Sequence, residues 1–131
     1  MAGFRGCARA GTAAALLMAA APATAAEIAI SCGAVGIELE LCREGAEAWA
    51  AETGHTVRIV STPNATNERL ALYQQILAAR GADIDVYQVD IIWPGILGTH
   101  FIDLAPHMAG AENDHFDAIV ANNTVDGELK A

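Results

Sequence analysis

The stretch DIDVYQVDIIWPGIL, residues 83–97, decides the fold. Its centre, residues 85–90, is a short run rich in β-branched residues with an acidic residue at each end, and we interpret it as a strand. Asp85 enters this strand and Asp90 leaves it. The regular pattern loosens after Trp93 and Pro94, where a short helix and a turn are expected.

Upstream of this stretch, the chain alternates between two kinds of pattern. Residues 27–32 and 55–62 predict two further strands, and residues 36–52 and 66–80 predict helices, because their apolar residues recur at helical spacing. Trp49 lies on the apolar face of the first helix and is expected in the core. The order β-α-β-α-β predicts an α/β fold with a mostly parallel sheet and flanking helices.

Local signals set the expected ends of these elements. Gly54 and Gly81 are expected to end the two helices, and Thr66 or Asn67 is expected to cap the second one. Asp126 and Gly127 form a hairpin turn signal, and the chain ends at Ala131, where the second arm of that hairpin should begin.

The first 25 residues are typical of a secretory signal peptide. Arg5 and Arg9 precede the apolar run AGTAAALLMAAA, and Ala23 and Ala25 provide a small-x-small cleavage site. The apolar run is too short to span a membrane. We therefore predict a signal peptide at residues 1–25 and a periplasmic protein.

The charge and the cysteines limit the partners and the compartment. The formal net charge is −9 and residues 1–25 contain no acid, which argues against nucleic acid and against anionic membranes as partners. Cys7 would leave with the signal, so Cys32 and Cys42 remain as a candidate disulfide, with two buried free thiols as the alternative. The four histidines are scattered, and we expect no metal and no cofactor.

Candidate binding residues follow the predicted strands. In an open parallel sheet, ligands bind beyond the carboxyl ends of the strands. Glu38, or its neighbour Glu40, Arg69, Asp90 and Trp93 all come after a strand. Each has a structural alternative: acids favour a helix start, the arginine can be solvated and the tryptophan can be core. Carboxylates, a guanidinium and an aromatic face suit a sugar, and they also suit other polar ligands.

The run TNERLALYQQILAARGADIDVYQVDIIWPGIL (66–97), with SCGAVGIELELC (31–42), HFIDL (100–104) and IVANNTVDGEL (119–129), resembles a known family. The resemblance is to the family 1 extracellular solute-binding proteins of ABC importers, in particular the trehalose/maltose-binding group.

The resemblance implies two α/β lobes that close on a disaccharide and present it to a membrane permease. Residues 26–131 would be an incomplete N-terminal part of the first lobe. The resemblance also implies that Asp90, Glu38 and Arg69 contact sugar, and that the protein is a monomeric binding protein without catalytic residues. The alternatives are a non-functional remnant of a truncated gene and a secreted glycoside hydrolase that uses Glu38 and Asp90.

Overall fold

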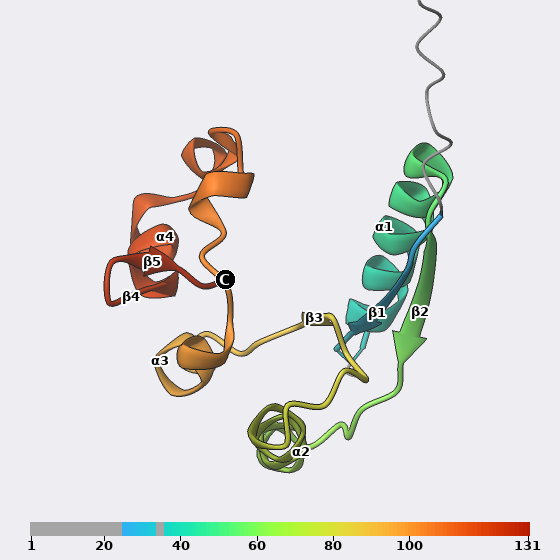
Figure 1. Ribbon diagram of the computed structural model, residues 1–131, viewed down its shortest axis with the longest axis horizontal. Coiled ribbons are helices and arrows are strands. Elements are labelled where there is room, and N and C mark those ends of the chain that lie inside the picture. The colour runs from blue at the N-terminus through green and yellow to red at the C-terminus, as the bar shows by residue number, and fades with distance from the viewer. Residues whose placement is uncertain (1–24, 34–35) are drawn as a thin grey trace, which may run out of the picture.

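The computed structural model describes residues 25–33 and 36–131, so the predicted signal peptide lies outside the described residues except for Ala25. Its first half alternates strands and helices in the expected order (Figure 1). The elements are β1 (Glu27–Ser31), α1 (Glu38–Thr53), β2 (Thr56–Val60), α2 (Thr66–Ala78) and β3 (Val86–Tyr87).

These three strands form one parallel sheet in the order β2-β1-β3. Glu27 of β1 pairs with Thr56 of β2, and Ile30 of β1 pairs with Val86 of β3. The predicted fold class, a mostly parallel α/β sheet with flanking helices, is therefore confirmed.

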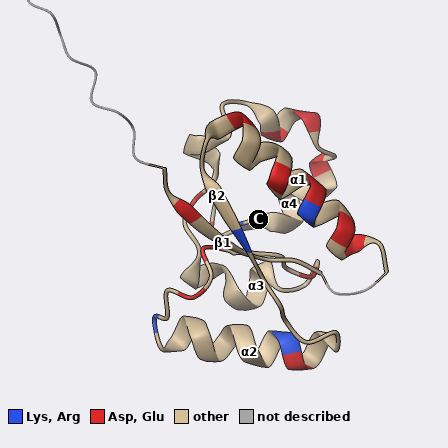
Figure 2. Ribbon diagram, turned by 90° about the vertical axis from the view of Figure 1, so that its right-hand side faces the viewer, with Lys and Arg blue, Asp and Glu red and all other residues tan. Residues whose placement is uncertain are grey.

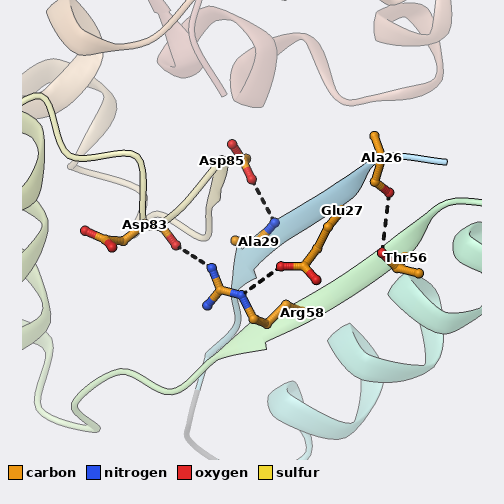
Figure 3. A network of polar contacts seen from close by, with 7 residues as sticks. All are labelled: Ala26, Glu27, Ala29, Thr56, Arg58, Asp83 and Asp85. Carbon is orange, nitrogen blue, oxygen red and sulfur yellow. Dashed lines mark hydrogen bonds and ion pairs between the residues drawn. The ribbon is translucent and has the colours of Figure 1, made fainter. Parts of the chain in front are cut away.

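The third strand is shorter than predicted, with two residues in place of residues 85–90. The Asp85 side chain explains where the pairing begins, because its Oδ2 accepts a hydrogen bond of 2.8 Å from the Ala29 backbone N–H (Figure 3). The Asp85 N–H in turn donates to the Ala29 carbonyl. A carboxylate therefore takes the place of a backbone carbonyl at the start of this strand pair.

A second polar contact ties the same edge together. Arg58 of β2 donates from Nε to Glu27 Oε1 at 3.3 Å and from Nη2 to the Asp83 carbonyl at 3.1 Å (Figure 3). Arg58 thereby links β2, β1 and the segment that leads into β3. Asp83 contributes its backbone, so its side chain is free of this network.

The two long helices cover opposite faces of the sheet. Alternate residues of a strand point to opposite faces. Ser31 faces α2, since its Oγ accepts a hydrogen bond of 2.7 Å from the Tyr73 hydroxyl. The buried core, Tyr73, Ile84, Trp93 and Leu97, lies on this side.

The other face of the sheet is covered only in part. None of the α1 residues is buried, and Trp49, expected in the core, is 38% exposed. The prediction for Trp49 is therefore wrong. The apolar stripe of α1 is present at helical spacing, but among the described residues only β1, β2 and one residue of β3 line the hollow beneath it.

Two of the predicted helix ends differ in detail. Gly54 ends α1 in the left-handed conformation, with φ of 73°, as predicted. The residue before α2 is Ala65, and no side chain caps this helix, so the prediction of a cap by Thr66 or Asn67 is wrong. Arg80, with φ of 52°, is the left-handed residue after α2 in place of Gly81.

The part of the chain after β3 holds short elements: α3 (Pro94–Leu97), η1 (Gly98–His100), η2 (Ala105–His107), η3 (Ala111–Asp114), α4 (Asp117–Asn123), β4 (Thr124–Val125) and β5 (Glu128–Leu129). Asp126 and Gly127 have positive φ angles and join β4 to β5 as the predicted hairpin. Contrary to expectation, the second arm is present before Ala131. Within the described ranges, no helix combines the length and the apolar character that crossing a membrane requires.

Candidate functional site

The carboxyl ends of β1, β2 and β3 meet at one edge of the sheet, because the strands are parallel. Gly33 follows β1, Thr62 follows β2, and Gln88 follows β3. The candidate residues from the sequence also come after these strands. This edge is where the structure can hold a polar ligand.

Glu38 is the first residue of α1 and reaches back over Gly33. A Cβ atom on Gly33 would clash with Glu38 Oε2 and would lie 2.7 Å from Gln88 Oε1. With glycine at this position the two side chains can lie as they do, whereas a larger residue would displace their ends. The carboxylate also stands at the positive end of the helix dipole, which stabilises its charge. Glu40, the alternative, is exposed in the same helical turn.

Arg69, in the first turns of α2, is buried, with 8% of its surface exposed. Its guanidinium lies over the Trp93 ring, with 5.4 Å between Cζ and the ring centroid. Nε and Nη1 are buried without a hydrogen-bond partner among the described residues. A buried cation with free donors is costly unless an acceptor pairs with it.

Trp93, considered from the sequence as a surface for stacking, is 1% exposed. Its ring packs edge-on against Tyr73, with centroids 5.7 Å apart, and Arg69 covers it. Within this part of the chain, Trp93 therefore supports Arg69 and has no open face for a ligand.

Asp90 follows β3 at the same edge and is partly buried. Its Oδ1 accepts a hydrogen bond of 3.3 Å from the Ile92 backbone N–H. This turn fixes the carboxylate. The same carboxylate can accept further hydrogen bonds, since a carboxylate can accept about four. Asp90 can thus accept from a ligand without losing its own support.

Two further polar groups at this edge were not among the residues predicted from the sequence. Thr62 Oγ1 and Gln88 Oε1 are both buried and lack hydrogen-bond partners within the described ranges. Gln88 was hidden because the third strand was expected to run to Asp90. Thr62 was missed for a similar reason, because the second strand was expected to include it, whereas β2 ends at Val60.

Tyr87 lies close to this edge but belongs to the core. Its ring meets Tyr73 edge-on at 4.9 Å. Burial raises the pKa of the Tyr87 hydroxyl above its ordinary value of 10.0, with smaller contributions from Tyr73, Asp83 and Asp85. The group is therefore neutral at physiological pH and carries no charge into the site.

A disulfide joins the end of β1 to the second turn of α1. Cys32 and Cys42 are bonded, with their Cα atoms 5.9 Å apart, which agrees with the pairing expected from the sequence. Because α1 has no buried residue, this bond is the firmest link between the helix that carries Glu38 and the sheet.

Acidic residues are concentrated on α1 (Figure 2). Among the described residues, Arg69 is the buried cation. In residues 25–33 and 36–131, no cluster of three or more His, Cys, Asp or Glu residues could hold a metal ion. The arrangement offers hydrogen-bond acceptors and one guanidinium donor, which is binding chemistry.

Comparisons with known proteins identify the class. The chain is 47% identical over 114 residues to a probable ABC transporter-binding protein of Deinococcus radiodurans, a match that covers 86% of this chain and 27% of the relative. It is 35% identical over 71 residues to an uncharacterised protein in the bglA 3′ region of Thermotoga maritima, which covers 53% of this chain and 72% of that one. No family model matches the chain.

Among solved structures, the maltose-bound MalE3 of T. maritima superposes with a TM-score of 0.74 and 30% identity. The match covers 80% of this chain and 27% of that structure. Taken with the fold and the polar edge of the sheet, these matches show that the chain is similar to solute-binding proteins of ABC transporters. Within that class, its particular likeness is to a maltose-binding protein, about a quarter of whose length it spans.

Proposed function

We propose that the chain is part of the substrate-binding component of an ABC importer of the family 1 type, which binds a sugar in the periplasm. The ligand would be a disaccharide such as maltose or trehalose, and the membrane permease would be the partner that receives it. The protein would act as a monomer and perform no chemistry. The likeness to a maltose-bound structure supports the choice of ligand.

The observation that carries this proposal is the buried guanidinium of Arg69, whose Nε and Nη1 have no partner in the described part of the chain. A rigid fork of donors suits neighbouring oxygens on one ligand. Trp93 holds the guanidinium in place, and Glu38 and Asp90 add acceptors for sugar hydroxyls. Closure of a second lobe over this edge would then shift the population toward the bound form.

Calorimetric titration of the protein with maltose, trehalose and sucrose tests the proposal. Saturable binding without turnover of the sugar is expected. Asp90→Ala should weaken that affinity by ~1–3 kcal/mol, because ligand hydroxyls lose an acceptor that the turn at Ile92 holds in place. Glu52→Ala, at an exposed acid in the last turn of α1, serves as the control and should bind as the unchanged protein does. Equal affinity for Asp90→Ala would remove Asp90 from the site.

We also propose that residues 1–25 are a cleaved signal peptide and that residues 26–131 form the incomplete N-terminal part of a lobe. The disulfide supports an oxidising compartment. The match to only 27% of the length of two relatives supports a longer parent protein. A non-functional remnant would give no saturable binding of any of the three sugars. A glycoside hydrolase would release products from them.

A further inference from the structure

The side chains of Glu38 and Gln88 converge on one point above Gly33. A Cβ atom on this glycine would lie 2.7 Å from Gln88 Oε1 and 3.0 Å from Gln88 Nε2, and closer still to Glu38 Oε2. The carboxylate comes from the start of α1 and the amide from the residue after β3. Two elements that are distant in the sequence thus bring an acid and an amide together.

The backbone of Gln88 is fixed by buried groups. Its N–H donates to the carbonyl and to the Oγ of Ser31, each at 3.2 Å. Ser31 is 0% exposed, and its Oγ also accepts a hydrogen bond of 2.7 Å from the Tyr73 hydroxyl. The position of Gln88 is therefore set by β1 and α2 before any ligand arrives, as a binding residue requires.

The side chain of Gln88 is nevertheless unsatisfied. Its Oε1 is buried and has no hydrogen-bond partner in residues 25–33 and 36–131. A buried acceptor without a donor destabilises the protein, and a leucine or methionine of similar size would not carry this penalty. No N–H or O–H group among the described residues supplies the donor that this oxygen lacks.

We propose that Gln88 is a ligand-binding residue that, together with Glu38, binds two neighbouring hydroxyl groups of one sugar ring. One hydroxyl donates to Gln88 Oε1 and the adjacent hydroxyl donates to Glu38, while the amide N–H₂ is free to donate to a ligand oxygen. This inference rests on the proposed sugar-binding function. It adds Gln88, the residue after β3, to the site. The group that the site recognises is then a pair of hydroxyls on neighbouring ring carbons.

The test uses the protein as it accumulates in its own cells. Three forms are compared: the unchanged protein, the Gln88→Met variant and the Gln88→Leu variant. Each form is titrated by calorimetry with whichever of maltose, trehalose and sucrose the unchanged protein binds, and with its monodeoxy analogues. We expect Gln88→Met to weaken binding roughly 10-fold, because a ligand hydroxyl loses its acceptor. One monodeoxy analogue should bind the unchanged protein more weakly than the parent sugar does. The same analogue should bind Gln88→Met as well as the parent sugar does.

Unfolding in urea separates binding from structure. Because Oε1 has no partner in the described part of the chain, Gln88→Met should be at least as stable as the unchanged protein without sugar. Gln88→Leu repeats the test with a different shape, should one variant fail to fold. Gln74→Met, at an exposed glutamine on α2, is the matched control and should change neither affinity nor stability.

Three outcomes are distinct. Weaker binding at unchanged or raised stability, with one analogue losing its penalty, supports the role of Gln88. Unchanged affinity in both Gln88 variants overturns the inference and leaves the proposed function standing. Absence of binding of all three sugars by the unchanged protein overturns the proposed function and, with it, the inference.

Discussion

Tyr73 and Tyr87 pack edge to face in the core, with ring centroids 4.9 Å apart, yet their hydroxyl groups have opposite surroundings. The Tyr73 hydroxyl donates to Ser31 Oγ at 2.7 Å. The Tyr87 hydroxyl is buried and finds no partner among the residues that the structure describes. The pair therefore offers a matched test of what a buried hydrogen bond contributes here.

Tyr73→Phe should lower the free energy of unfolding by about 0.5–1.5 kcal/mol, because it removes the hydrogen bond to Ser31. Tyr87→Phe should leave it unchanged or raise it slightly, because a buried hydroxyl without a partner is lost. Urea unfolding followed by tryptophan fluorescence measures both. An equal loss of unfolding free energy in the two variants would show that the hydrogen bond from Tyr73 to Ser31 does not stabilise the protein.

Asp85 offers a second test at the residue scale. Asp85→Ala removes the acceptor for the Ala29 N–H inside the sheet and should destabilise the protein by about 1–3 kcal/mol. Asp83→Ala is the control: its carbonyl, not its side chain, accepts from Arg58, so the change should stay within about 0.5 kcal/mol. A shift of the urea midpoint in the control alone would contradict the role assigned to Asp85.

At the scale of elements, α1 lies on the sheet with little burial of its side chains. It runs for 16 residues without a buried side chain, and its apolar Leu41 and Trp49 remain 56% and 38% exposed. The Cys32–Cys42 disulfide anchors its second turn. The order of the helix that carries Glu38 thus depends on a covalent bond more than on packing.

The double variant Cys32→Ser, Cys42→Ser should lose about 3 kcal/mol of stability, as the loss of a bridge closing a loop of this size predicts. Amide hydrogen exchange should become faster along α1 and stay slow in α2, whose Tyr73 is 0% exposed. Equal acceleration in both helices would mean that the bond stabilises the whole fold and not α1.

The order of elements could be predicted from the sequence, because the periods of helices and strands differ and the glycine after α1 is an unambiguous stop. The end of β3 could not, since a side chain, that of Asp85, takes over part of the pairing. Arg69 was found by its place in the chain. Its burial against Trp93 depends on tertiary packing, and Gln88 was missed because the longer predicted strand hid it.

At the scale of the whole molecule, apolar side chains remain uncovered away from the core. Ile91, Ile92 and Ile102 are between 61% and 66% exposed, and Phe116 is 83% exposed. They lie in the part of the chain that follows β3. Covering side chains as apolar and as exposed as these would stabilise the protein.

We expect the protein that accumulates in its own cells to have a mass well above the 13.6 kDa of this sequence, since further chain would cover these side chains. Intact-mass spectrometry measures this directly. A mass of 13.6 kDa less that of residues 1–25 would instead mean that the short chain is the mature protein, and it would contradict the proposed importer function.

The sheet register has a consequence for the order of folding. Ala26 meets His55 across 29 residues, whereas Ala29 meets Asp85 across 56. Longer loops close at a greater entropic cost, and contacts distant in sequence form more slowly. The β1-α1-β2 unit should therefore assemble first and β3 should dock last. Pulse-labelled hydrogen exchange should find the backbone amides of β2 protected before the backbone amide of Gln88. The final step of folding would then complete the binding edge.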